Sequence, residues 1–188
     1  MLNFENNPNV QRLHPEEEIW VYKNFLSKEE VSSIYDVSKN LSDEAWGGDA
    51  ARHTIEWYNG RSSLIVPELI PVRNKIQDLV QGYSVTPGES LARMWPGDTM
   101  HEHEDSCGDE GTDDTDDNNT CAITEYGCVF YINDDFEGGN LYYPNLSLSY
   151  TPSAGDLVIH GSRIRHGVSE VKSGIRYVYP SFLYRNGN

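Results

Sequence analysis

The pattern of hydrophobic and polar positions divides the chain into a first part with two helices and a second part of short strands. Ser27 followed by Glu30 is a capping-box signature, and hydrophobic residues at helical spacing continue to about residue 40. A second helix is predicted over 67–80, where apolar residues share one face and two prolines lie near the start. Alternating apolar residues predict a strand over 18–23, ahead of the first helix.

From residue 89 onward, short apolar runs alternate with turn residues. The predicted strands cover 90–95, 123–132, 140–143, 147–151, 156–160, 166–171 and 175–184. Strands this short and frequent predict a mainly β fold of the α+β class, a sandwich or jelly roll with the two helices packed on one sheet.

The length of 188 residues fits one domain with a sizeable core. Residues 1–16 are polar and predict a flexible N-terminal arm, so the domain itself is expected over 17–188. Within it we expect a helical support over 17–88 and a β core over 89–185. The segment 106–120 is rich in Gly, Asp, Asn and Thr, which predicts an acidic, mobile loop.

Composition and charge exclude some classes of partner. The net charge of −16 argues against nucleic acid, because phosphate backbones are met by Lys and Arg. No 18-residue apolar stretch and no signal-peptide pattern occur, so we expect a soluble cytoplasmic protein without a membrane partner. The three cysteines have no metal-site spacing and fit a reducing compartment.

The acidic residues are concentrated in one part of the chain. The stretch 94–162 contains no Lys or Arg but holds fifteen of the thirty Asp and Glu residues. One interpretation is a solvated acidic surface; the other is a bound cation that relieves the repulsion between carboxylates. Composition alone leaves both interpretations open.

Three residues form a candidate metal site. His103 and Asp105 are separated by one residue, and on an extended path residues i and i+2 point the same way, so both can reach one ion. Together with His166 they supply two imidazoles and one carboxylate, the facial triad that leaves open positions on non-haem iron for oxygen chemistry. His-x-Asp alone is also typical of a surface histidine in an acidic loop, so the sequence after His166 decides between a metal site and a surface histidine.

Arg176 follows His166 at a spacing that suits a second binding group. If 172–174 forms a hairpin turn, Arg176 lies opposite Glu170 and faces the same way as His166. The gap is about four strand residues, roughly 13 Å at about 3.3 Å per residue. That gap accommodates a metal and a five-carbon dicarboxylate whose far carboxylate pairs with the guanidinium in a bidentate contact. The alternative is an ordinary exposed strand arginine.

Several motifs occur in a characteristic order. Gly97 stands six residues before His103. The others are Phe25-Leu26-Ser27 before an acidic helix start, Tyr131-Ile132-Asn133, Gly138-Gly139-Asn140-Leu141, Pro152-x-x-Gly155-Asp156 and His166-Gly167-Val168-x-x-Val171-x-x-Gly174-x-Arg176. In this order they resemble the prolyl 4-hydroxylase-like branch of the 2-oxoglutarate/Fe(II) dioxygenases over about residues 18–184. The acidic segment after Asp105 is longer than in many relatives, which bears on the substrate rather than on the metal.

The resemblance implies a double-stranded β-helix (jelly roll) with His103, Asp105 and His166 as iron ligands. It implies that Arg176 binds the C5 carboxylate of 2-oxoglutarate and that Tyr131 donates a hydrogen bond to it, although Tyr131 equally fits a core aromatic. Fe(II), 2-oxoglutarate and O₂ are then required, with ascorbate as a further cofactor. The implied reaction hydroxylates a C–H bond of a prolyl residue in a peptide or protein and releases succinate and CO₂.

Two other functions stay open. One is hydroxylation of another amino-acid side chain or of a free amino acid; the other is a non-catalytic jelly-roll module whose acidic loop binds Ca²⁺. Of the remaining histidines, we expect His101 to be a bystander or a neighbour of the ligands, and His160 to be a hydrogen-bonded polar residue rather than a ligand. We expect a monomer or a weak dimer.

Overall fold

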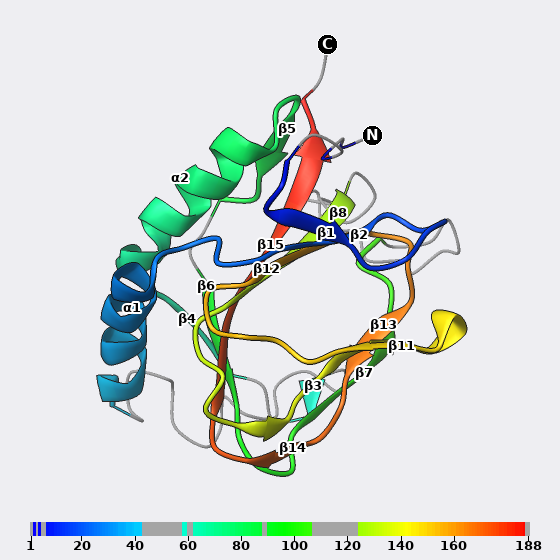
Figure 1. The fold of residues 1–188 in the computed structure, drawn as a ribbon. Helices are drawn as coiled ribbons and strands as arrows, with labels where there is room; N and C mark the ends of the chain where they lie inside the picture. Colours follow the sequence, from blue (N-terminus) through cyan, green and yellow to red (C-terminus); the bar gives the residue numbers. More distant parts are fainter. Residues whose placement is uncertain are drawn as a thin grey trace, which may run out of the picture.

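The computed structural model describes residues 2, 4, 7–42, 58–59, 62–87, 90–106 and 124–186. Within these residues the chain is mainly β, with two β-sheets that face each other and two α-helices outside one of them (Figure 1). A third, two-stranded ladder of β9 (Glu137–Gly138) and β14 (Val171–Ser173) lies at one end.

The larger sheet runs in the order β1-β2-β12-β8-β15-β6-β4, and β5 pairs with the far end of β15. Its strands are β1 (Val10–Arg12), β2 (Ile19–Tyr22), β12 (Leu157–Gly161), β8 (Thr124–Tyr131), β15 (Arg176–Arg185), β6 (Ser90–Met94), β4 (Ser62–Ile65) and β5 (Tyr83–Val85). All of the pairings are antiparallel, and the long strands β8 and β15 form the centre of the sheet.

The smaller sheet runs in the order β11-β10-β13-β7-β3. Its strands are β11 (Leu148–Tyr150), β10 (Leu141–Tyr143), β13 (His166–Val168), β7 (Thr99–His103) and β3 (Tyr58–Asn59). The short helix η4 (Pro144–Leu146) connects β10 to β11. The chain crosses between the two sheets several times, for example from β6 to β7 and from β12 to β13, so residues that are distant in sequence meet between them.

Both helices lie on the outer face of the larger sheet, with α2 above α1 in the view of Figure 1. In α1 (Lys28–Asn40) the Ser27 side chain accepts from the Glu30 amide and Glu30 accepts from the Ser27 amide, so the predicted capping box is confirmed. The second helix begins as η2 (Pro67–Leu69) and continues as α2 (Ile70–Leu79), close to the predicted 67–80.

The larger sheet has a core on each of its faces. Outward-facing residues such as Phe130, Tyr179 and Leu157 pack with Val72 and Ile76 of α2 and with buried residues of α1. The inward face contributes a second cluster: Ile19, Val21, Ala92, Tyr131, Val158 and Val178, together with Leu141, Tyr143 and Tyr150 of the smaller sheet. Alternation along each strand thus separates a helix-packed face from a face directed at the other sheet.

Two expectations about chain path need correction. Residues 10–12 lie in the expected flexible arm but form β1 on the edge of the larger sheet, and Leu2 and Phe4 are buried in the core beside the helices. Apolar residues in an otherwise polar segment thus hold it in place. Residues 166–171 are not one strand that folds back on 175–184; they split into β13 and β14, while β15 lies in the opposite sheet.

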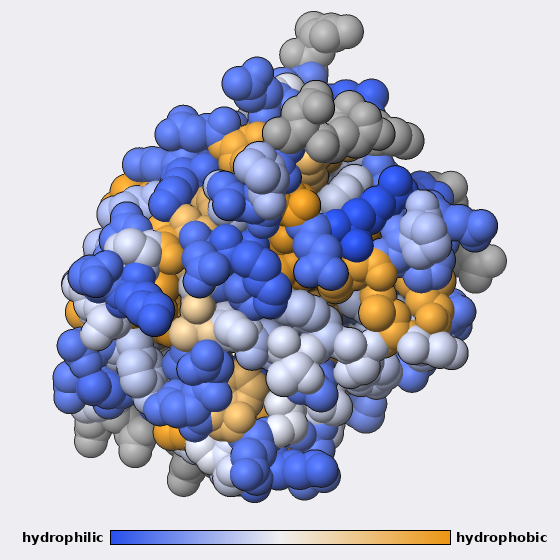
Figure 2. Space-filling model, viewed as in Figure 1, coloured by the Kyte–Doolittle hydropathy of each residue, from blue (hydrophilic) through white to orange (hydrophobic). Residues whose placement is uncertain are grey.

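The predicted acidic loop 106–120 lies outside the described residues apart from Ser106, as do Cys107 and Cys121. Cys128 is buried on β8 and forms no disulfide within the part of the chain that the structure describes. Among the described residues, no helix has the length and apolarity needed to cross a membrane. The face seen in Figure 2 is mostly hydrophilic, with separate hydrophobic patches between polar side chains.

Candidate metal centre

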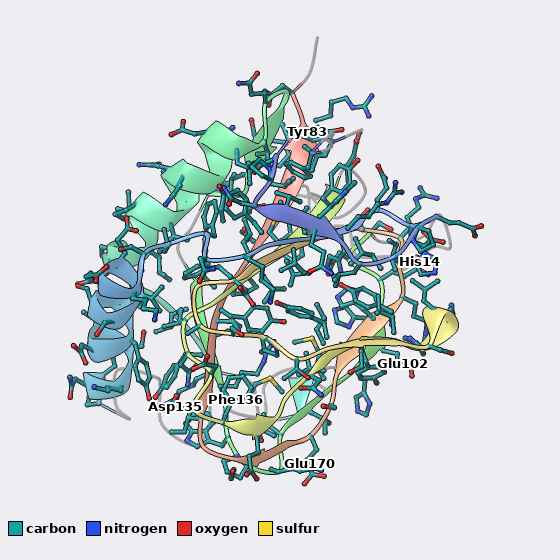
Figure 3. All side chains as sticks on the ribbon, in the orientation of Figure 1. His14, Tyr83, Glu102, Asp135, Phe136 and Glu170 are labelled. Carbon is teal, nitrogen blue, oxygen red and sulfur yellow. The ribbon has the colours of Figure 1, made fainter. Side chains whose placement is uncertain are left out.

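A shift in the β7–β13 ladder brings the two predicted histidine ligands together. His103 is the cross-strand partner of His166, while Met100 is the partner of Val168, so three steps on β7 match two on β13. Such a bulge resets the alternation of side chains, which lets Met100 and His103 face the same pocket. Glu102 lies on the outer side of the sheet (Figure 3) and is exposed. The rings of His103 and His166 are 4.4 Å apart between centroids.

Asp105 completes the predicted triad from the segment that follows β7. Its backbone amide donates to the carbonyl of Ser162, 2.8 Å away, which holds this part of the chain beside the larger sheet. The Asp105 Oδ1 atom lies 3.7 Å from His103 Nε2 and 3.7 Å from His166 Nε2. One donor atom from each of the three residues lies within 4.8 Å of the others. The spacing i, i+2 therefore does bring His103 and Asp105 to one place.

Both histidines are oriented through their Nδ1 atoms. His103 Nδ1 lies 2.8 Å from the His101 carbonyl and His166 Nδ1 lies 2.9 Å from the Ile164 carbonyl, so each Nδ1 carries the hydrogen and each Nε2 presents a lone pair. Burial lowers the pKa of His166 to about 3, with a further contribution from His160 and an opposing one from Asp105. The neutral imidazole is the form that binds a metal.

The carboxylate is nearly buried: the Asp105 side chain is 8% exposed. Burial opposes its ionisation, but the hydrogen bond from His160 and the nearby histidines outweigh burial and hold the pKa of Asp105 below its ordinary value. An ionised carboxylate and two imidazoles that present their Nε2 atoms therefore meet at one point. These are donors that Fe(II) and related transition metals accept.

Arg176 lies in the same pocket, although the reason differs from the sequence argument. It begins β15 in the larger sheet, opposite Met94, and therefore faces the smaller sheet that carries His166. Its side chain is buried, at 2% exposure, and its Nη1 contacts the Met94 sulfur at 3.6 Å. Its Nε has no hydrogen-bond partner among the described residues, and no carboxylate of those residues forms an ion pair with it.

Tyr131, the other predicted co-substrate residue, lies beside Arg176 on β8. Its ring centroid is 5.2 Å from the guanidinium carbon, and its hydroxyl is buried without a hydrogen-bond partner in the described part of the chain. Burial raises the pKa of Tyr131, and the Arg176 charge opposes that rise. Two buried polar atoms, the Tyr131 hydroxyl and the Arg176 Nε, thus lie in the interior without a hydrogen bond of regular geometry to the described residues. Such groups are rare in folded proteins unless a ligand satisfies them.

The pocket joins the triad to Arg176. It encloses about 520 Å³, counted with the open space at its mouth. Between its polar groups the wall is apolar: Met100, Val129, Leu141, Val168, Val178, Pro180 and Phe182. Arg176 is its one Lys or Arg within the described residues. A narrow apolar pocket with a metal-type triad and a buried guanidinium suits an anionic chelating ligand, since each polar group has a defined role.

His160 is also part of this centre, which its position at a predicted strand end did not reveal. It is a hydrogen-bonded polar residue, as predicted, but its ring lies 4.1 Å from that of His166 and its Nε2 lies 3.2 Å from Asp105 Oδ2. Gly127 was the available signal: a glycine inside a predicted strand often marks a close approach. His101 is exposed, and its carbonyl accepts from His103.

Comparison with known protein families and with curated protein sequences finds no match to this chain. Comparison with solved structures does find similar folds. A prolyl-4-hydroxylase of Pseudomonas putida aligns with 92% of this chain and 95% of its own, at 18% identity and a TM-score of 0.64. The viral collagen prolyl hydroxylase of Paramecium bursaria Chlorella virus-1, in a 2OG complex, aligns over 93% and 100%, at 18% identity and 0.64.

A third similar structure is the prolyl hydroxylase of Trichoplax adhaerens in complex with a hypoxia inducible factor oxygen degradation domain peptide fragment. It aligns over 90% of this chain and 84% of its own, at 16% identity and a TM-score of 0.66. The chain therefore has the fold of the prolyl hydroxylases, and the alignment spans nearly all of it.

Proposed function

We propose that this protein is a 2-oxoglutarate- and Fe(II)-dependent oxygenase that hydroxylates a prolyl residue in a peptide or protein, with release of succinate and CO₂. His103, Asp105 and His166 are its metal ligands, and Arg176 and Tyr131 bind the co-substrate. The two facing sheets are the double-stranded β-helix of that class, and O₂ is the oxidant, with ascorbate as a supporting reductant.

The observation that carries the proposal is the buried guanidinium of Arg176 in the pocket that holds the triad. Burial of a cation without an ion pair raises the free energy of the folded protein. A dicarboxylate offsets this increase when its far carboxylate pairs with the guanidinium. Tyr131, whose ring centroid lies 5.2 Å from the guanidinium carbon, is the proposed hydroxyl donor to the same carboxylate. Its raised pKa keeps the hydroxyl protonated, as a donor must be.

The chain's residues position and shield the reaction. Bound Fe(II) supplies the activation of O₂ that breaks an unactivated C–H bond, and the protein decides where that happens. His103, His166 and Asp105 would hold the metal, and a set of two imidazoles and one carboxylate would leave room on it for the co-substrate and O₂. The apolar pocket wall excludes water, which protects a reactive centre from side reactions.

The donor set of the described centre suits a transition metal rather than Ca²⁺, while the acidic loop 106–120, the calcium site of the alternative module, lies outside the described residues apart from Ser106. Ca²⁺ binds six to eight oxygen atoms, whereas the described centre offers two imidazole nitrogens and one carboxylate. The choice of substrate rests on the similar prolyl hydroxylases alone. Another amino-acid side chain, or a free amino acid, is therefore the second candidate for the hydroxylated group.

Turnover with a panel of substrates tests the proposal. The Fe(II)-loaded protein is incubated with 2-oxoglutarate and proline-containing peptides, matched peptides with alanine in place of proline, or free amino acids. Succinate release and an added oxygen atom are read by mass spectrometry. We expect the proline peptides to stimulate succinate release above the uncoupled rate. Stimulation by alanine peptides or by free amino acids alone contradicts the prolyl assignment, and no succinate from any mixture contradicts the oxygenase assignment.

A further inference from the structure

His160 lies inside the metal centre but outside the set of donor atoms that converge on one point. It comes from β12 in the larger sheet, is 1% exposed, and faces the smaller sheet. Its Nε2 lies 3.2 Å from Asp105 Oδ2, and its Nδ1 lies 3.1 Å from the hydroxyl of Tyr143. His160 therefore bridges a fully buried tyrosine on β10 and the carboxylate of the triad.

The direction of these hydrogen bonds follows from the carboxylate. The ionised Asp105 can only accept, so the atom that faces it, Nε2 of His160, has to carry the hydrogen. The other ring nitrogen, Nδ1, then accepts the hydrogen bond that the Tyr143 hydroxyl donates. The chain of donors runs from Tyr143 through His160 to Asp105 Oδ2. The other carboxylate oxygen, Oδ1, is the one at 3.7 Å from both ligand imidazoles.

Gly127 makes the contact between His160 and Asp105 sterically possible. It is the cross-strand partner of His160 on β8, and a Cβ atom at this position would lie 2.0 Å from Asp105 Oδ2 and 2.5 Å from His160 Nε2. Such distances are well inside van der Waals contact, so any other residue would push the two side chains apart. The absence of a side chain at Gly127 thus leaves space beside β8 for this hydrogen bond.

We propose that His160 is a positioning residue that holds Asp105 as a one-oxygen ligand, and that Tyr143 fixes the tautomer in which His160 does so. A carboxylate that binds through both oxygens uses two positions on the metal. With two imidazoles, it leaves only two positions, which a chelating 2-oxo acid fills. Occupation of Oδ2 by the His160 donor keeps a third position open. The inference rests on the proposed function for the identity of the metal and the co-substrate.

The inference can be tested by the affinity of the protein for a metal, without a measurement of turnover. Co(II) binding to the metal-free protein is measured by calorimetry for the parent, His160→Phe, His160→Gln and Tyr143→Phe. Outer-shell partners of metal ligands typically contribute about 10- to 100-fold in affinity, and we expect a loss in that range for His160→Phe. His160→Gln can present an amide N–H near the position of Nε2, so it should restore most of the affinity, which simple repacking would not.

A double-mutant cycle tests the relay from Tyr143. Tyr143→Phe should weaken Co(II) binding in the parent but have no further effect in the His160→Phe variant, because the hydroxyl that it removes makes its described hydrogen bond to the His160 ring. Tyr150→Phe is the matched control: this buried hydroxyl on β11 bonds to Asp156 rather than to the metal centre, and its removal should leave Co(II) affinity unchanged. The visible spectrum of bound Co(II) should change in His160→Phe and revert in His160→Gln.

Three results overturn the inference. The first is parent-like Co(II) affinity and spectrum in His160→Phe. The second is complete loss of binding in both His160→Phe and His160→Gln, which would make His160 a ligand. The third is an additive effect of Tyr143→Phe in the His160→Phe background. The parent distinguishes these from failure of the proposed function: a parent that binds neither Co(II) nor Fe(II) refutes the function, whereas a parent that binds both leaves only the role of His160 in question.

Discussion

Replacement of Arg176 separates the cost of a buried charge from the binding energy that it provides. Arg176→Met keeps an unbranched side chain of similar length but removes the guanidinium. In the parent without ligand, this cation is 2% exposed, and its Nε has no hydrogen-bond partner among the residues that the structure describes. Replacement of a buried charge by an apolar side chain is often neutral or stabilising. We therefore expect the ligand-free variant to melt at the same temperature as the parent or higher.

The bound state should behave in the opposite way. A charge-assisted bidentate pair contributes about 1.5–3 kcal/mol, which corresponds to roughly a 10- to 100-fold rise in the dissociation constant of 2-oxoglutarate. At a ligand concentration of about 100 times the parent's constant, the parent gains about 2.7 kcal/mol of stability. A variant with hundredfold weaker binding gains only about 0.4 kcal/mol under the same conditions. Arg176→Lys should fall between the two, because it keeps the charge but loses the fork.

Two measurements check this prediction. Anaerobic titration of the Fe(II)-loaded protein with 2-oxoglutarate, followed by the absorption of the chelate, gives the affinity, and thermal melting with and without ligand gives the stability. Arg185→Met is the matched control, since this arginine lies on the same strand but pairs with Glu125 at the surface. If Arg176→Met binds 2-oxoglutarate as tightly as the parent, Arg176 does not bind the co-substrate.

Three further predictions concern other parts of the structure. Asp105→Ala should reduce Fe(II) affinity by more than about a hundredfold, which is the upper end for outer-shell partners. Glu102→Gln, on the outer side of β7, should leave the affinity unchanged. Equal Fe(II) affinities of the two variants in a calorimetric titration refute the ligand assignment. Gly127→Ala should destabilise the protein by about 1–3 kcal/mol and weaken metal binding as well, because its Cβ overlaps Asp105; a melting curve and a Co(II) titration matching the parent contradict this. Burial raises the pKa of Asp135, but its hydrogen bonds, first that from Tyr35, outweigh burial and hold the pKa below its ordinary value. A depressed carboxyl pKa stabilises the fold at pH values above the unfolded-state pKa. The loss of stability in Tyr35→Phe should therefore be largest near neutral pH and shrink as the pH falls below about 4. Chemical denaturation at several pH values measures this loss.

The sequence predicted those parts of the site that depend on local spacing. His103 and Asp105 meet because residues i and i+2 of an extended chain point the same way, and the capping box at Ser27 depends on residues only three apart. Arg176 was predicted to face His166 through a hairpin, and it does face the same pocket, but from the opposite sheet. Parity along a strand predicts which way a side chain points, not which sheet carries the strand.

The contacts that the sequence did not predict all depend on how distant strands align. The bulge that turns His103 inward is a property of the β7–β13 register, and the hydrogen bonds of His160 need β12 and β10 to face each other at one level. Leu2 lies in a polar segment, and only the folded core shows where it is buried. Register between sheets depends on the packing of the whole molecule, so no short pattern encodes it.

The way in which His103 is held also bears on how this protein can diverge. His103 is fixed by its ladder partner His166, and Asp105 by the hydrogen bond from its amide to the Ser162 carbonyl. Both contacts are made by the backbone, so they do not depend on which side chains line the rest of the pocket. Residues of the pocket wall can therefore change in evolution, and with them the ligands that the pocket accepts, while the positions of these two residues are kept.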